Sequence, residues 1–203
     1  MKKNADAVAV FRDTFAERLQ AVLPSAPAQA IALWAMDESR VGLQTVRRRR
    51  LTARGTKPVG VQQQRFENFY LYGAVAPQSG DGYFLGMPKL TADGFQRFLD
   101  EFAAARPDTL NVLLVDNSRC HHAKALVVPA NVVLLFQEPY APELNPAERV
   151  WQALKDVLAW QRFTDLAALQ DRVVEIVRDW QTDLLRSLTA YPYIMAAINA
   201  LSP

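Results

Sequence analysis

The chain has 203 residues, a formal net charge of +2 and a hydrophobic fraction of 50%, enough to bury the core of about one domain. No apolar run approaches the roughly 20 residues that span a bilayer, and the lysine-rich start leads into an amphipathic pattern. The single cysteine, Cys120, excludes an internal disulfide and offers no paired spacing for structural zinc. We therefore expect a soluble, cytoplasmic protein with no membrane partner.

The positive charge is concentrated in one segment. Residues 39–66 contain no Asp or Glu and hold eight cations, so this segment carries +8 and the rest of the chain −6. The cations are Arg40, Arg47, Arg48, Arg49, Arg50, Arg54, Lys57 and Arg65. A short arginine run is usually a solvated loop, but an acid-free segment of this length favours a polyanion partner.

The first elements along the chain are a helix and a buried strand. Residues 5–23 place apolar side chains at spacings of three and four, which predicts an amphipathic helix that Pro24 ends. After a short linker, the apolar run IALWAM (31–36) predicts a buried strand with Asp37 and Glu38 at its end.

Paired strands and a helix follow the basic segment. NFYLYGAVAP (68–77) and YFLGMP (83–88) flank a turn signal and indicate antiparallel pairing. Residues 91–105 place phenylalanines on one helical face, with Thr91 as the N-cap.

The next elements repeat the pattern of an apolar strand that ends in an acid. NVLLVDN (111–117) ends at Asp116 and leads into a short helical stretch through HHAKAL, and NVVLLFQEP (131–139) is another strand. Amphipathic helices then run from Asn145 through the C-terminal third. Strands joined first directly and then through helices predict an α/β fold with a mixed sheet.

Glu148 has two interpretations. Asn145 at the N-cap, Pro146 at the first helical position and Glu148 at N3 resemble a helix start, in which the glutamate reaches back to the cap. However, Glu148 lies off the apolar stripe, and two strands each end in an aspartate, Asp37 and Asp116. Three acids that converge suit hard divalent cations, and such a cluster can hold two magnesium ions about 4 Å apart for phosphoryl transfer.

The adjacent histidines do not predict zinc, because no second spaced pair of ligands accompanies them. We expect His121 to support the acid site or to contact a phosphate, and a role at a helix end is an equal alternative for His122.

Five stretches of the chain together carry a family resemblance: LWAMDESRVGL (33–43), RRRRLTARGTKPVG (47–60), RFENFYLYGAV (65–75), LLVDNSRCHHAK (113–124) and YAPELNPAERVWQALKD (140–156). They resemble the transposases of bacterial insertion sequences related to the mariner elements. The last is the most specific, although Ala141 replaces the usual serine of the family signature.

This resemblance implies a ribonuclease H-like fold with a five-stranded mixed sheet and a DDE triad of Asp37, Asp116 and Glu148. Glu38 and Glu143 lie close to Asp37 and Glu148 in the sequence, but neither matches the third acid of the family. Mg²⁺, with Mn²⁺ as a substitute, is the implied cofactor, and double-stranded DNA the implied partner of a bacterial, nucleoid-associated homodimer. Supporting residues would be Asn117, His121 and Asn145, and phosphate contacts would come from Arg47, Arg48, Arg49, Arg50, Arg54 and Lys57.

The expected organisation is an N-terminal helix and linker (1–30), a catalytic domain (31–160) and a C-terminal helical extension (161–203). The helix-turn-helix modules of such transposases are not recognisable in residues 1–30, so recognition of transposon ends is not expected from this chain. Two alternatives to a DNA strand transferase remain: an inactive, transposase-derived DNA-binding or regulatory module, and a nuclease acting on hybrids or junctions.

Overall fold

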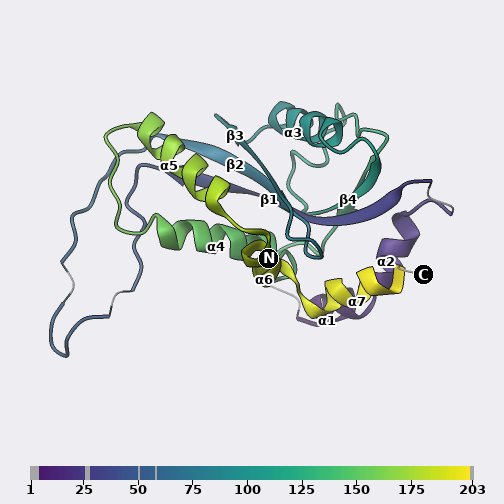
Figure 1. The fold of residues 1–203 in the computed structure, drawn as a ribbon, viewed down its shortest axis with the longest axis horizontal. Helices are drawn as coiled ribbons and strands as arrows, with labels where there is room; N and C mark the ends of the chain where they lie inside the picture. The colour runs from purple at the N-terminus through teal and green to yellow at the C-terminus, as the bar shows by residue number, and fades with distance from the viewer. Residues whose placement is uncertain (1–4, 26–27, 50, 58, 202–203) are drawn as a thin grey trace.

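The computed structural model describes residues 5–25, 28–49, 51–57 and 59–201, which form a mixed sheet with helices on both faces (Figure 1). The strands are β1 (Ala30–Gly42), β2 (Asn68–Val75), β3 (Gly82–Met87), β4 (Thr109–Val115) and β5 (Val132–Phe136), in the spatial order β3-β2-β1-β4-β5. Antiparallel pairing joins β1 to β2 and β2 to β3, whereas β4 runs parallel to both β1 and β5. The predicted mixed five-stranded sheet is confirmed.

The helices are α1 (Ala5–Asp13), α2 (Phe15–Val22), α3 (Ala92–Ala104), α4 (Ala147–Val157), α5 (Leu166–Asp179), α6 (Thr182–Thr189) and α7 (Pro192–Leu201), and a 3-10 turn (Pro142–Leu144) precedes α4. Within the described residues, no helix is long and apolar enough to cross a membrane.

One face of the sheet is covered by α3. Its phenylalanines pack on the even-numbered residues of β1 and on β4, for example Phe102 near Trp34 with ring centroids 5.1 Å apart. Thr91 caps the helix as expected, because its Oγ1 accepts a hydrogen bond from the Gly94 backbone at 3.1 Å. This apolar layer excludes water from the face of the sheet that α3 covers.

The opposite face carries the other helices. There, α4, α5 and α6 pack over β2 and the second half of β1, with Trp151 and Leu154 against Leu71. Helices α1, α2 and α7 pack over β4 and β5, with Phe15 and Ile194 among the buried residues. The division into segments 1–30, 31–160 and 161–203 stays a prediction. The helices at both ends of the described chain pack on the same sheet that carries the acids.

Strand β1 is longer than predicted. It continues beyond Asp37 to Gly42, because its second half remains paired with β2 after β4 has ended. The residues that follow Asp37 point alternately to the two faces of the sheet, with Ser39 and Val41 buried. This is the alternation of a strand, although most of these side chains are polar. Asp37 therefore lies within the strand, at the point where the parallel pairing stops.

Three other local predictions need correction. HHAKAL forms turns and no helix, because Ser118 N donates to Asp116 Oδ1 and His121 N to Ser118 O. The first helix is interrupted at Thr14, whose hydroxyl bonds to the Val10 carbonyl. The segment 182–201 divides into α6 and α7 before Pro192, since proline cannot donate within a continuing helix.

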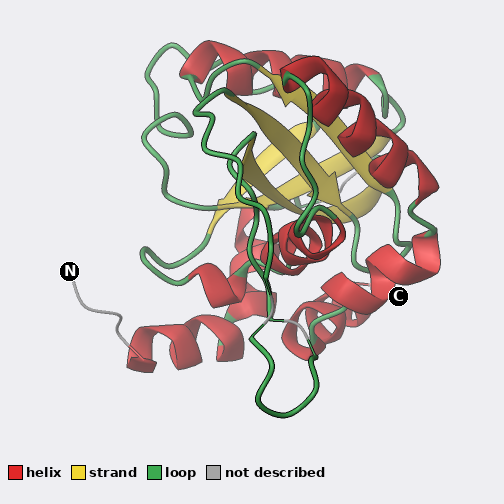
Figure 2. Ribbon diagram, turned by 90° about the vertical axis from the view of Figure 1, so that its left-hand side faces the viewer, coloured by secondary structure: helices red, strands yellow, loops and turns green. Residues whose placement is uncertain are grey.

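Most of the basic segment lies in an arm, defined here as the described residues 44–49, 51–57 and 59–67, which connects β1 to β2 along the chain and projects away from the sheet (Figures 1 and 2). Its described residues form no helix or strand. Trp160 holds the base of the arm, since its Nε1 donates to the Arg48 carbonyl at 3.1 Å and its backbone N to Val46 O at 3.0 Å. A side chain at Gly60 would collide with the Trp160 ring, which lies 2.5 Å from a Cβ placed there. The arm is therefore anchored beside α4.

Candidate active site and basic groove

Asp37 is fixed between β1 and α4. Odd-numbered residues of β1 face the α4 side, so Asp37 points there, and its Oδ2 accepts a hydrogen bond from Trp151 Nε1 at 2.9 Å. Its partner across the antiparallel pair is Gly73. A Cβ at Gly73 would lie 2.5 Å from the Trp151 ring, so the missing side chain makes room for the indole over the acid.

Asp116 comes directly after β4, beside Asp37. The parallel register pairs Ala35 with Leu114, and two further residues along each chain bring the two aspartates level. Ser118 N donates to Asp116 Oδ1 at 2.9 Å, and the Asp116 side chain is 43% exposed. The sheet register itself thus brings these two acids together.

Glu148 is presented by the start of α4. The helix begins at Ala147, so Glu148 is its second residue and not the predicted N3. Asn145 connects this helix start to β1, because its Nδ2 donates to the Met36 carbonyl at 2.7 Å while its Oδ1 accepts from Ala147 N at 3.0 Å. Asn145 is buried, so it sets the position of the α4 start relative to Asp37.

The three acids line one cavity of about 590 Å³, together with Asn117, Asn145 and the loop that follows β5. Burial raises the pKa of Asp37 well above its usual range, and the negative charges of Glu38, Glu148 and Asp116 raise it further. A set of clustered carboxylate oxygens fits a hard divalent cation such as Mg²⁺ or Mn²⁺. A bound cation would remove the mutual repulsion that raises this pKa.

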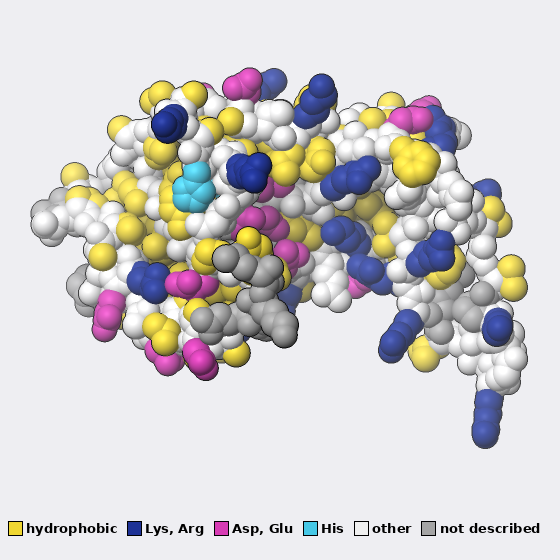
Figure 3. All heavy atoms as spheres, turned by 180° about the vertical axis from the view of Figure 1, so that it is seen from behind, with side chains coloured by type: hydrophobic (Ala, Val, Ile, Leu, Met, Phe, Trp, Pro, Cys, Tyr) yellow, Lys and Arg dark blue, Asp and Glu magenta, His cyan; other side chains and the backbone are white. Residues whose placement is uncertain are grey.

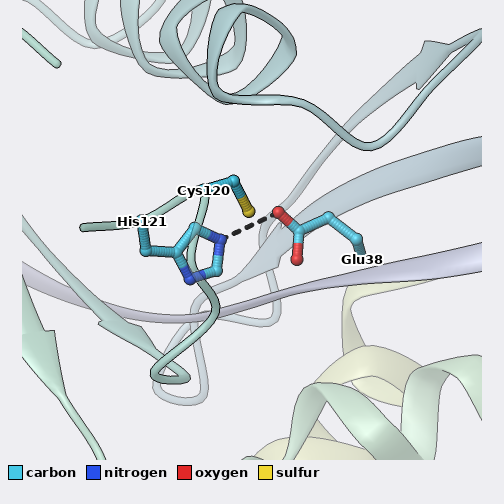
Figure 4. Close-up of side chains that lie close together, drawn as sticks. All are labelled: Glu38, Cys120 and His121. Atoms are coloured by element: carbon cyan, nitrogen blue, oxygen red, sulfur yellow. Dashed lines mark hydrogen bonds and ion pairs between the residues drawn. The ribbon is translucent and has the colours of Figure 1, made fainter. Parts of the chain in front are cut away.

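His121 lies behind Asp116 and between two carboxylates. Its Nδ1 lies 2.9 Å from Asp116 Oδ1 and 3.1 Å from the Asp116 carbonyl oxygen. Its Nε2 lies 2.9 Å from Glu38 Oε1 (Figure 4). Burial lowers the pKa of His121, but hydrogen bonds with Asp116, Cys120 and Glu38 outweigh it and raise the pKa to about 12. The same hydrogen bond from His121 lowers the pKa of Asp116. Both shifts describe an imidazolium held between carboxylates.

Asn117 lines the cavity and contacts His122. Asn117 Nδ2 donates to the Gln137 carbonyl, and Asn117 Oδ1 lies 3.1 Å from His122 Nε2. The His122 ring stacks on Phe136 with centroids 4.3 Å apart. Asn117 therefore connects the turn after β4 to the chain after β5.

A groove of about 1100 Å³ adjoins the acid cavity, and Glu148 lines both. Its cations are Arg48, Arg49, Arg149 and Lys155. Figure 3 shows acidic side chains gathered near the middle of one face, with Lys and Arg side chains beside them and along the projecting arm. This groove has the charge and breadth to hold a polyanion next to the acids.

The predicted phosphate contacts have different environments. Arg48 forms an ion pair with Asp156, and Arg47 Nη2 bonds to Gln62 Oε1 at 2.6 Å. Arg54 and Lys57 are exposed on the arm, and Arg50 lies outside the described residues. Arg49 is exposed and lines the groove.

Sequence reasoning missed three kinds of contribution. The sequence does not show the contact of Trp151 with Asp37, it gives Glu38 no role at the site, and the expected basic set does not contain Arg149 and Lys155. The position of Arg149, directly after Glu148 on the exposed side of an amphipathic helix, was the signal that could have identified it. No sequence pattern pairs Glu38 with His121, 83 residues away.

Comparison with known proteins identifies the family. A family model described as DDE superfamily endonuclease matches residues 32–170, more than half of the chain and the whole of the acid cavity. The chain belongs to this family. The DDE domain is also 39% identical over 88 residues to the uncharacterised protein y4pE/y4sA of Sinorhizobium fredii, covering 43% of this chain and 65% of that protein.

Solved structures of the Mos1 mariner transposase share the fold of the DDE domain. The Mos1 paired-end complex with the left transposon end superposes with a TM-score of 0.70 at 17% identity, over 98% of this chain and 63% of the Mos1 chain. The Mos1 paired-end complex with Mn gives a TM-score of 0.70 at 17% identity, over 93% and 60%. The predicted ribonuclease H-like transposase fold is thus confirmed, and the chain spans less than two thirds of each of these proteins.

Proposed function

We propose that this DDE domain is the catalytic domain of a transposase and performs metal-dependent DNA cleavage and strand transfer. The observation that carries the proposal is the convergence of Asp37, Asp116 and Glu148 on one cavity that opens beside a cation-lined groove. The sequence similarity to DDE endonucleases and the Mos1-like fold support the same chemistry.

The three carboxylates would bind the metal, and we propose that they bind two Mg²⁺ ions. Bound divalent ions would activate the attacking oxygen and stabilise the leaving oxygen of a phosphodiester. Asp37 is held by Trp151, and Glu148 by the Asn145 connection to β1. The protein thus supplies preorganised oxygen ligands at a fixed separation.

The basic groove and the arm would hold the DNA. A DNA strand whose phosphates contact Arg49, Arg149 and Lys155 would also run past Glu148. Its scissile phosphate would then lie next to the three acids. Water would first attack the scissile phosphodiester, breaking its bond to the 3′ oxygen and leaving a 5′-phosphate and a free 3′-hydroxyl. This hydroxyl would then attack a phosphodiester of the target strand, forming a new phosphodiester and releasing the 3′-hydroxyl of the cut target strand. Joining two transposon ends to one target favours a homodimer as the working form.

Glu148→Gln tests the proposal most simply, because Glu148 is exposed and its replacement keeps the size of the side chain. We expect nicking and joining to be abolished, while the unfolding temperature and nonspecific DNA affinity stay unchanged. Glu175→Gln, an exposed glutamate on α5, is the matched control and should remain active. Full activity of Glu148→Gln would exclude Glu148 from the mechanism.

A further inference from the structure

Glu38 follows Asp37 in the sequence but faces the other side of the sheet. Successive strand residues point to opposite faces, so Glu38 is directed toward the α3 side, where its cross-strand partner is the buried Tyr72. Its side chain is only 6% exposed. Glu38 is therefore separated by β1 from the cavity into which Asp37 points, and it is poorly placed to share a metal with Glu148.

A buried carboxylate needs a partner, and the partner of Glu38 is His121. The His121 side chain is 0% exposed and packs on Phe95, with ring centroids 4.2 Å apart. Nε2 contacts Glu38 Oε1 at 2.9 Å. Nδ1 faces Asp116, 2.9 Å from its Oδ1 and 3.1 Å from its carbonyl oxygen. The imidazole thus forms a rigid bridge from the α3 side of the sheet to the acid cavity.

We propose that Glu38 and His121 are positioning residues that hold the Asp116 carboxylate in the orientation required for metal binding. The proposal rests on the proposed function. His121 Nδ1 and Ser118 N both contact Oδ1 of Asp116, and neither uses Oδ2, which the proposal assigns to the metal. Because the Asp116 side chain is 43% exposed, packing alone does not fix its rotamer, and the two contacts of Oδ1, with His121 and with Ser118 N, do so together.

Cys120 belongs to the same cluster, since its Sγ lies with a Glu38 oxygen and a His121 nitrogen within 4.8 Å of one another (Figure 4). A zinc ion in the cluster is the competing interpretation. Tetrahedral zinc with oxygen and nitrogen ligands at about 2.0 Å separates them by about 3.3 Å. The 2.9 Å between His121 Nε2 and Glu38 Oε1 is a hydrogen-bond distance, so the geometry favours the bridge.

Two substitutions of His121 separate its two contacts. The side-chain amide nitrogen of asparagine can stand near Nδ1 and face Asp116, whereas that of glutamine can stand near Nε2 and face Glu38. We therefore expect His121→Gln to raise the Mn²⁺ dissociation constant about 10–100-fold, and His121→Asn to keep it near that of the unaltered protein. Electron paramagnetic resonance of Mn²⁺ measures both without any cleavage assay.

Glu38→Gln and Cys120→Ser complete the test. Glu38→Gln is nearly isosteric and should weaken Mn²⁺ binding less than His121→Gln, because the amide oxygen still accepts from the ring. Cys120→Ser removes a zinc ligand and should leave Mn²⁺ binding and zinc content unchanged. The Mg²⁺ concentration for half-maximal cleavage should rise in His121→Gln, and saturating Mg²⁺ should restore the rate.

Several results would overturn the bridge. Equal losses in the Asn and Gln variants with a lowered unfolding temperature would mean a structural role alone. Stoichiometric zinc that disappears in Cys120→Ser would establish a metal cluster instead. Mn²⁺ binding by His121→Gln as tight as in the unaltered protein would refute the positioning role and leave the proposed function intact. Failure of the unaltered protein to bind Mn²⁺ would refute the proposed function itself, and the bridge with it.

Discussion

The indole nitrogen of Trp151 donates a hydrogen bond to the carboxylate of Asp37, with Nε1 and Oδ2 2.9 Å apart. This contact joins α4 to β1 at the acid that the cavity surrounds. Trp151 also packs on Phe84, with centroids 6.1 Å apart, so one side chain both fills the core and orients a ligand.

Replacement of Trp151 by Phe separates these two roles. Phenylalanine keeps most of the packing but cannot donate, so we expect Mn²⁺ affinity to fall about tenfold and the free energy of unfolding by about 1 kcal/mol. Calorimetric titration and urea unfolding measure the two quantities. Trp180→Phe, which alters another indole packed on Phe84, should leave Mn²⁺ affinity unchanged, and an equal loss there would refute the orienting role.

Gly73→Ala tests the close approach beneath that indole. The added methyl would lie 2.5 Å from the Trp151 ring and 2.8 Å from Phe84, so we expect a loss of about 1–3 kcal/mol from overpacking together with weaker Mn²⁺ binding. In Gly86→Ala the added methyl would lie 3.9 Å from the Phe69 ring, an ordinary van der Waals contact, and this variant should be nearly neutral. Comparable unfolding midpoints for the two variants would contradict the packing argument.

The raised pKa of Asp37 predicts a pH-dependent stability in the absence of metal. Because the folded pKa lies above the unfolded value of about 3.9, Asp37 supports folding while protonated, and this support is lost as pH rises through the folded pKa. Asp37→Asn stays neutral and can still accept from Trp151. We therefore expect this variant to be more stable than the unaltered protein at pH 8, and the difference to disappear near pH 4.

Urea unfolding in the presence of a chelator measures this difference. The exposed Asp171 of α5 provides the control, because Asp171→Asn should change stability equally little at both pH values. If Asp37→Asn were less stable than the unaltered protein at pH 8, other groups would have to stabilise the ionised Asp37 carboxylate in the metal-free fold, and the prediction would be wrong.

The arm predicts the salt dependence of DNA binding. If Arg54 and Lys57 contact phosphates, replacing both with alanine should reduce the slope of log affinity against log salt by about 0.9 per contact. The control pair is Lys89 and Arg97, exposed cations near α3, which should leave the slope unchanged. Equal slopes for both double variants would exclude the arm from the DNA interface.

The sequence predicted the elements whose apolar pattern is strong. Strand β4 and helices α3 and α4 follow from continuous or periodic hydrophobic residues, and the acids at Asp37 and Asp116 were recognised because they follow such runs. The parallel register then brings these two acids level, as expected for the ends of adjacent parallel strands. The second half of β1 was missed, because its polar residues conceal the alternation.

Other features depend on contacts that no local pattern encodes. The orientation of Glu38 follows from the length of β1, and its partner His121 lies in the turns after β4, where it packs on Phe95 of α3. Similarly, the donation from Trp151 to Asp37 depends on the crossing of α4 over β1 and on the glycine at position 73. These relationships arise from tertiary packing, so the sequence alone does not reveal the contacts of Glu38 and Trp151.

Anomalous diffraction from crystals soaked in Mn²⁺ tests the metal site most directly. We expect manganese in the cavity with oxygen ligands from Asp37 and Asp116, and with Glu148 beside it. Manganese bound instead at Glu38, Cys120 and His121, or no ion within reach of the three acids, would contradict a phosphoryl-transfer site in this domain.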